Sequence, residues 1–522
     1  MIKFFSFFQA LFLFSIHASD IAIVDFGSQT THLISRRLRD MGIESHIVPP
    51  EHILETLPSV SGVILSGSPA SVHDEGAPKV DPSLFHAGIP ILGICYGWQL
   101  MAHALGGSVE RSHSEYGIEE IAIDDRLLGL PKAKFPVVVS HGDSITSLPP
   151  GFTVIGSTER VNAAAAVNRD KKWMGLQFHP EMEHTVFGSE ILRFFATDFC
   201  QLSPTVKNSI DLDSVIQKIQ NAVGEQDEVI CAVSGGVDST VAAFLIAQAI
   251  GKRMHAVYVD TDLMRPGTRE KVSDIFTHHV NADLIIVDAN ERFMQALEGV
   301  RDPESKRKLI GKLYVDIFQE VAATLKGIQF LAQGTIYSDV IESKGSSHAS
   351  KIKSHHNVGG LPENLSFRLL EPLREFYKDE VRKLGFLAGL PLEYVQVHPF
   401  PGPGYGIRIR GEVTQKRLMQ IRGADAIIME EVQKARLYDQ VFQCFAVMTG
   451  AYSTAVKGDG RAFEEVVAIR AYESLDVMTA NWAKLPYSLL EKISRRIVGE
   501  VPGISRVVYD ITDKPPATME WE

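Results

Sequence analysis

The chain has 522 residues, of which 45% are hydrophobic, so it is long enough for two to four domains and can bury real cores. Its 64 acidic residues outnumber its 52 basic residues and give a net charge of −12. These values exclude an intrinsically disordered chain and argue against a protein that follows a nucleic-acid backbone.

Residues 20–203 alternate short apolar segments with amphipathic ones. Predicted strands cover residues 21–26, 62–65, 90–94, 137–140 and 172–177, and predicted helices cover residues 30–41 and 96–105. This alternation predicts an α/β domain with a mostly parallel sheet.

Within this domain, the stretch Gly93-Ile94-Cys95-Tyr96-Gly97 predicts a sharp turn from strand to helix. Such a turn exposes the sulfur of Cys95, and the N-terminus of the following helix favours its thiolate form. The N–H of Tyr96 is then placed to face an oxyanion, and a second donor is expected from the turn at Gly67.

A cysteine nucleophile needs a base, and the base needs an orienting group. The stretch Phe178-His179-Pro180-Glu181 follows a predicted strand and supplies both. The two stretches resemble the signature of class I glutamine amidotransferases. The resemblance implies that Cys95 attacks the amide of glutamine, His179 moves protons and Glu181 orients His179, releasing glutamate and ammonia. One departure is Ser68, where many relatives carry a second glycine; its backbone N–H is retained.

Residues 204–395 form the second predicted domain, in which residues 204–227 make a linker and an amphipathic helix. An apolar strand at 228–233 precedes Ser234-Gly235-Gly236-Val237-Asp238-Ser239, and a helical segment follows. Glycines and free N–H groups at a helix N-terminus make a phosphate site, and the carboxylate of Asp238 makes sense there as a ligand of Mg²⁺. All six residues are predicted to bind ATP.

This stretch is not a Walker motif. It resembles the loop of the N-type ATP pyrophosphatases, which cut ATP between the α- and β-phosphates and adenylate a substrate oxygen. Further strands at 257–259, 284–287 and 330–332 predict a second parallel sheet, whose ligands bind beyond the carboxyl ends of its strands.

Residues 344–360 have the composition of a long loop, which ends in the stretch Lys353-Ser354-His355-His356-Asn357-Val358-Gly359-Gly360. Residues 396–522 form the third predicted domain, with helix and strand segments at 424–437, 441–448, 464–471 and 488–499 and a last strand at 506–511. Its last residues suggest an extended strand that sets Lys514 against a nucleotide phosphate and Glu520 against a base edge.

These segments resemble those of the GMP synthetases in the same order along the chain. The resemblance implies that Arg307 holds the nucleotide substrate and that Lys353 reaches ATP and the purine oxygen from a lid. It implies a ligand contact for Asp459 and a homodimer formed by the C-terminal module. Val397 stands where relatives generally have Arg, and Asp262 stands where the usual pattern ends in Gly, so Asp262 has no assigned role.

The fold class expected from all this is α/β, with two doubly wound parallel-sheet domains plus a small α+β C-terminal dimerisation domain. The expected reaction is glutamine-dependent amination of xanthosine 5'-phosphate to GMP, with ATP as co-substrate, Mg²⁺, and no organic prosthetic group. No nucleic-acid or membrane partner is expected. Two rival interpretations stay open: a nucleotide-binding regulator with an inactive amidotransferase, and a tRNA-thiolating enzyme with the same phosphate loop.

Residues 1–19 are assigned to no domain. They contain one basic residue, Lys3, an aromatic-rich apolar run and Ala18-Ser19, which is the shape of a weak signal peptide. The first predicted strand begins almost at that cleavage point, and ATP use favours the cytosol. The four scattered cysteines, which form no C-x-x-C pair, also fit a reducing compartment. We therefore favour an over-extended start and a cytoplasmic protein, with secretion as the alternative.

Overall fold

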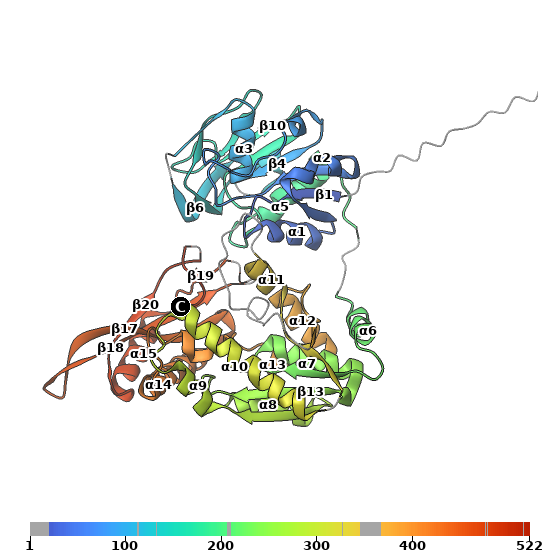
Figure 1. Cartoon of the computed structure of the whole chain (residues 1–522). Coiled ribbons are helices and arrows are strands. Elements are labelled where there is room, and N and C mark those ends of the chain that lie inside the picture. The colour runs from blue at the N-terminus through green and yellow to red at the C-terminus, as the bar shows by residue number, and fades with distance from the viewer. Residues whose placement is uncertain are drawn as a thin grey trace, which may run out of the picture. The chain divides into compact units, whose positions relative to one another are not determined.

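The computed structural model describes residues 20–111, 114–131, 133–205, 210–325, 327–344, 367–474, 477, 479–514 and 516–522. The chain divides into two compact units, Met1–Lys207 and Asn208–Glu522, which can be followed by colour in Figure 1. The N-terminal extension and Lys353 with its predicted lid lie outside the described residues.

The first unit is built on a nine-stranded sheet in the order β2-β1-β3-β4-β11-β10-β9-β6-β7. Five neighbouring strands run parallel: β2 (Ser45–Val48), β1 (Asp20–Val24), β3 (Val60–Leu65), β4 (Ile91–Ile94) and β11 (Trp173–Leu176). The other four pair antiparallel: β10 (Ala165–Asn168), β9 (Thr153–Ser157), β6 (Glu115–Ile123) and β7 (Lys134–His141). The parallel half confirms the α/β class. The strand predicted at 137–140 belongs to the antiparallel half, so the sheet is mixed.

Both faces of the parallel half are buried. Along β1, Ile21 and Ile23 belong to one apolar cluster, whereas Ala22 and Val24 belong to another. Successive side chains of a strand point to opposite faces, which explains the unbroken apolar run in the sequence. The remaining elements of this unit are α1 (Thr31–Asp40), α2 (Ile53–Thr56), α3 (Tyr96–Ala104), α4 (Asp125–Leu128), α5 (Gly188–Phe194) and the short pair β5 (Ser108–Glu110) and β8 (Ser144–Ser147).

The second unit contains a five-stranded, wholly parallel sheet in the order β14-β13-β12-β15-β16. Its strands are β12 (Glu228–Ala232), β13 (Met254–Asp260), β14 (Asp283–Asp288), β15 (Ile328–Ala332) and β16 (Arg368–Leu370). The chain leaves β12 to one side and later returns to its other side at β15, so β12 ends at the topological switch point where α/β sheets bind ligands.

The helices of this part are α6 (Leu212–Ala222), α7 (Val237–Ile250), α8 (Thr268–His278), α9 (Asn290–Leu297), α10 (Pro303–Thr324), α11 (Tyr337–Lys344), α12 (Lys378–Ala388) and α13 (Leu392–Val395). Within the described ranges, no helix has both the length and the apolar stretch needed to cross a bilayer.

The C-terminal elements of the second unit form an α+β module. The long strands β17 (Gln443–Lys457) and β18 (Gly460–Glu473) pair antiparallel, and their hairpin projects outward in Figure 1. Strand β20 (Ile504–Asp510) pairs parallel with β18, and the short β19 (Asn481–Trp482) pairs antiparallel with it. Helices α14 (Gln415–Lys434) and α15 (Tyr487–Glu500) complete the module.

One apolar core joins this module to the parallel sheet. Ile230 of β12 and Val257 of β13 belong to the same buried cluster as Ile421 of α14, Ala446 of β17 and Ile493 of α15. The domain boundary predicted at 395/396 therefore crosses a continuous core, and it stays a prediction.

Candidate functional sites

Cys95 stands at the turn between β4 and α3 and has a strained backbone. Its φ of 52° and ψ of −108° are unusual for a side-chain-bearing residue, a conformation that costs about 1–3 kcal/mol and is typical of functional turns. The turn is tight, and it has no room for a side chain at its glycines: a Cβ on Gly97 would lie 2.2 Å from the carbonyl oxygen of Leu65. The sequence folds this way because only glycine fits on both sides of the nucleophile.

His179 and Glu181 follow β11, which pairs with β4, so the strand order brings them to the same edge as Cys95. Nδ1 of His179 lies 2.7 Å from Oε1 of Glu181, and both side chains are almost wholly buried. Burial alone would lower the pKa of His179, but the Glu181 carboxylate and a hydrogen bond with Cys95 outweigh it and hold that pKa well above its usual value. The three predicted residues therefore form a charge-coupled triad.

Backbone contacts fix the position of this triad. The hydroxyl of Thr185 donates to the carbonyl of His179 at 2.6 Å, and Nε of Arg37 donates to the carbonyl of Glu181 at 3.0 Å. Gly67 approaches the imidazole closely, since a Cβ on it would lie 3.2 Å from Cε1 of His179. Gly67 thus lies against the imidazole, and Tyr96 follows Cys95 directly at the start of α3; their oxyanion role stays a prediction.

The phosphate loop runs from the end of β12 into the first turn of α7. Ser234 and Ser239 close it: the N–H of Ser234 donates to Oγ of Ser239 at 3.1 Å, and the N–H of Gly236 donates to Oγ of Ser234 at 3.3 Å. Gly235 has a φ of 78°, in the left-handed region that favours glycine. Val237 begins the helix, so the loop presents its backbone ahead of a helix N-terminus, as predicted for a phosphate site.

The structure adds a partner for Asp238 that the sequence did not reveal. Nζ of Lys378 lies 2.6 Å from Oδ2 of Asp238, and Lys378 is itself buried. Burial raises the pKa of Asp238 while Lys378 opposes the rise. The second oxygen, Oδ1, is buried and accepts no hydrogen bond. A carboxylate oxygen of this kind fits a ligand of Mg²⁺. The described residues contain no cluster of three metal-ligating side chains.

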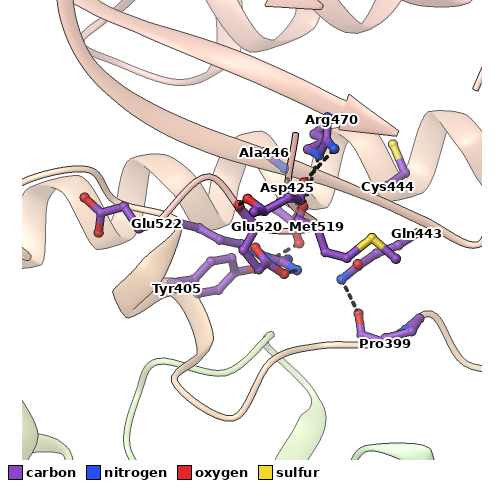
Figure 2. Close-up of polar contacts among 12 residues, drawn as sticks. Pro399, Tyr405, Asp425, Gln443, Cys444, Ala446, Arg470, Met519, Glu520 and Glu522 are labelled. Carbon is purple, nitrogen blue, oxygen red and sulfur yellow. Dashed lines mark hydrogen bonds and ion pairs between the residues drawn. The ribbon is translucent and has the colours of Figure 1, made fainter. Parts of the chain in front are cut away.

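The predicted substrate residues Arg307 and Glu520 lie on one polar cluster around the chain end. Arg307 donates to the terminal carbonyl oxygen of Glu522, whose side chain lies 2.5 Å from Nζ of Lys306. Both oxygens of Glu520 accept from Arg408, at 3.0 and 2.8 Å. Figure 2 shows this end of the chain beside the C-terminal module. The tail is therefore built into the fold instead of fraying.

Two other predicted substrate residues lie elsewhere. Lys514 pairs with Ala480 through the backbone, and its Nζ donates to the carbonyl of Val477 at 2.8 Å. Asp459 lies exposed in the turn between β17 and β18, the hairpin that projects outward in Figure 1. Among the polar contacts of the described residues, none joins Asp459 to Arg307 or Glu520.

Comparison with known proteins covers most of the chain. The family descriptions that match are "Glutamine amidotransferase class-I" over residues 22–199, "Thiamine biosynthesis protein (ThiI)" over residues 224–341 and "GMP synthase C terminal domain" over residues 430–521. The chain is 48% identical to a glutamine-hydrolysing GMP synthase of Methylococcus capsulatus, over 97% of this chain and 99% of that protein. It is 50% identical to the corresponding protein of Thermomicrobium roseum, over 96% of each chain.

Solved structures match a smaller part of the chain. One is a glutamine amidotransferase from Thermotoga maritima, which is 22% identical and covers 35% of this chain and 83% of its own, with a TM-score of 0.28. The order of the matching families along the chain is the order of the triad, the phosphate loop and the tail. Because about half of its residues are identical to those of these relatives over nearly the full length, the chain belongs to the family of glutamine-hydrolysing GMP synthases.

Proposed function

We propose that this chain aminates xanthosine 5'-phosphate to GMP, using ammonia that it releases from glutamine and the energy of ATP cleaved to AMP and pyrophosphate. The observation that carries the proposal is the presence, in one polypeptide, of the Cys95–His179 pair and of the phosphate loop with Asp238. The cysteine site releases ammonia, and the phosphate-loop site activates the purine oxygen that the ammonia nitrogen replaces.

In the amidotransferase unit, the sulfur of Cys95 attacks the amide carbon of glutamine. His179 takes the thiol proton and returns it to the departing ammonia, while Glu181 holds the imidazole and balances its charge. The N–H groups of Tyr96 and Gly67 face the oxyanion. Water then hydrolyses the thioester and releases glutamate.

In the synthetase unit, the 2-oxygen of xanthosine 5'-phosphate attacks the α-phosphorus of ATP, and pyrophosphate leaves. The loop from Ser234 to Ser239 cradles the departing phosphates, and the ammonium group of Lys378 balances their negative charge. Oδ1 of Asp238 would hold Mg²⁺, which supplies further charge neutralisation when bound. Ammonia then adds to the purine carbon, loses a proton and displaces AMP. The lid containing Lys353 and the contacts of Arg307, Lys514, Glu520 and Asp459 belong to the same proposal.

The active form proposed is a cytoplasmic homodimer assembled through the C-terminal module. Its support is the exposed apolar surface of the hairpin, where Val456 is 78% and Phe463 is 69% exposed and Tyr452 stacks on Phe463 with ring centroids 5.6 Å apart. Large exposed apolar side chains gathered on one element mark an interaction surface. Asp459, at the tip of this hairpin, would then reach substrate only in the partner protomer.

The test is incubation of the purified protein with ATP, Mg²⁺, glutamine and xanthosine 5'-phosphate. The expected products are GMP, AMP, pyrophosphate and glutamate in equal amounts. Cleavage of ATP to ADP and orthophosphate would contradict the proposal, as would failure to aminate the nucleotide with either glutamine or added ammonia. A tRNA-thiolating enzyme would want paired cysteines, whereas the four cysteines of this chain are all free.

A further inference from the structure

The loop of residues 261–267 joins β13 to α8, and the first residue of that helix, Thr268, lies against the phosphate loop. A Cβ on Gly235 would lie 2.6 Å from Cγ2 of Thr268. Thr268 in turn is tied to the loop, since its N–H and its hydroxyl both donate to the carbonyl of Arg265, at 3.2 and 2.7 Å. A shift of this loop would therefore displace the glycine that approaches the phosphates of ATP.

Two ion pairs fasten the same loop to helix α14 of the C-terminal module. Asp262 pairs with Arg422, whose Nη2 lies 2.5 Å from Oδ1 and also donates to the backbone carbonyl of Asp262. Arg265 pairs with Asp425 through Nε to Oδ2 at 2.7 Å and Nη2 to Oδ1 at 3.3 Å. The signs are reciprocal: an acid and a base three residues apart on the loop face a base and an acid three residues apart on the helix.

The Arg265–Asp425 end of this double pair is rigid. Asp425 is 1% exposed and also accepts from the hydroxyl of Tyr405 at 3.0 Å and from the N–H of Ala446 at 3.1 Å, as drawn in Figure 2. The N–H of Tyr405 donates to the carbonyl of Leu263 at 2.8 Å, which attaches the loop at a third point. A carboxylate with this many donors in a buried place keeps one geometry.

The Asp262 end is different, because water reaches it. The side chains of Asp262 and Arg422 are 34% and 22% exposed. Asp262 has a φ of 59°, a conformation that Asp tolerates and that glycine adopts freely. This explains why glycine suits the position in relatives with the usual pattern. Here the aspartate keeps the backbone conformation and adds a carboxylate that reaches α14.

We propose that Asp262 is a positioning residue for the adenylation site: with Arg422 it clamps the loop of residues 261–267, and through it Thr268 beside Gly235, to helix α14, and so sets the ATP phosphates relative to the substrate-binding module. The role rests on the proposed function, since it assigns the loop to ATP. It predicts that loss of the pair weakens ATP binding while leaving the chemistry and the separate glutamine site intact.

The experiment compares Asp262→Asn, Arg422→Gln and the double variant. We expect each single variant to raise KM for ATP in ammonia-dependent synthesis by about threefold to tenfold, with kcat within about twofold. Because the two residues act as one pair, the double variant should raise KM for ATP no more than the single variant with the larger effect does. Glutaminase activity should match that of the unchanged protein. Asn retains the size of Asp and its tolerance of the left-handed conformation, so folding is preserved.

Arg292→Gln with Glu320→Gln is the matched control, because this pair is also water-exposed and lies in the same unit, where it joins α9 to α10 at 2.8 Å. An unchanged KM for ATP in Asp262→Asn would overturn the proposal, as would effects that multiply in the double variant. A lowered Tm with unchanged ATP affinity would also overturn it, by showing a structural role alone. If the unchanged protein made no GMP, the proposed function would fail, and ATP affinities of the same variants measured by calorimetry would still decide the role of Asp262.

Discussion

Lys378, at the start of α12, neutralises Asp238 in the first turn of α7, although 140 residues separate them in the chain. Their 2.6 Å contact places a buried ammonium group at the phosphate loop, where pyrophosphate would leave. We predict that Lys378→Gln lowers both glutamine-dependent and ammonia-dependent GMP synthesis by at least about a hundredfold, because the departing phosphates lose a charge partner. ATP–pyrophosphate exchange measures the affected step. Lys383→Gln, an exposed lysine on the same helix, is the control and should leave the exchange unchanged.

Cys95→Ala separates the two chemistries. The variant should lose glutamine-dependent synthesis, because no thiolate remains to attack the amide. Synthesis from added ammonium chloride should stay within about twofold, since the phosphate loop lies in the other compact unit. Cys200→Ala, which alters another buried cysteine of the same unit, is the matched control and should retain both activities. Loss of both activities in Cys95→Ala would contradict separate sites.

The His179–Glu181 contact predicts a pH dependence of stability. The pKa of His179 is raised in the folded protein, so the pair contributes stability that is fully present below the unfolded value of about 6.5 and is lost as pH rises through the raised value. Glu181→Gln removes the carboxylate. The difference in Tm between the two proteins should therefore be largest near pH 6 and shrink toward alkaline pH. A difference that grows with pH would contradict this assignment.

The same substitution tests the catalytic assignment. Glu181→Gln should lower glutaminase kcat by about a hundredfold or more, because the imidazole loses its orienting acceptor, and should leave ammonia-dependent synthesis unchanged. Glutamate release measured alongside GMP formation from ammonium chloride distinguishes the two. Equal losses in both assays would indicate misfolding of the whole chain.

The chain end predicts a stability effect. Arg408 is fully buried, and Glu520 is its bidentate partner. Glu520→Ala leaves an uncompensated buried guanidinium group and should lower the free energy of unfolding by about 3–5 kcal/mol. Denaturant titration followed by fluorescence of Trp521 and the other tryptophans measures the loss. Glu491→Ala, which breaks an exposed pair with Arg495, should have little effect.

The hairpin predicts an oligomeric change. Replacement of Val456 and Phe463 by Glu adds charge to the apolar surface of β17 and β18 and should convert a dimer to a monomer in sedimentation velocity. Both side chains are largely exposed in one chain, so folding of the protomer should not be affected. A dimer that survives both substitutions would place the contact elsewhere.

Much of the fold could be predicted from local patterns. Short apolar runs followed by glycine-rich turns located β4, β12 and the helices after them, because a buried parallel strand leaves a continuous apolar signal. In the antiparallel half of the first sheet, only the segment 137–140, which is part of β7, was predicted as a strand. Strand β6, for example, alternates exposed and buried residues, and its partners are set by tertiary packing.

The candidate sites divide in the same way. Cys95 and the His179–Glu181 pair stand directly after strands, so their meeting at one sheet edge could be predicted. The partners of Asp238 and Glu520 could not, because Lys378 and Arg408 lie 140 and 112 residues away and carry no local motif. Asp262 was visible only as a departure from a pattern, and its contact with Arg422 spans 160 residues.

The apolar cluster that runs from β12 and β13 into α14 and α15 limits where this polypeptide can be divided. A cut in the segment near residue 207 would separate two halves that each keep their own interior. A cut near residue 395 would instead expose Ile, Val and Leu side chains of the shared core on both fragments, and each fragment would tend to aggregate in water. Gene fission, split reporters and module exchange in this enzyme should therefore use the boundary near residue 207, which separates the unit that produces ammonia from the unit that uses it.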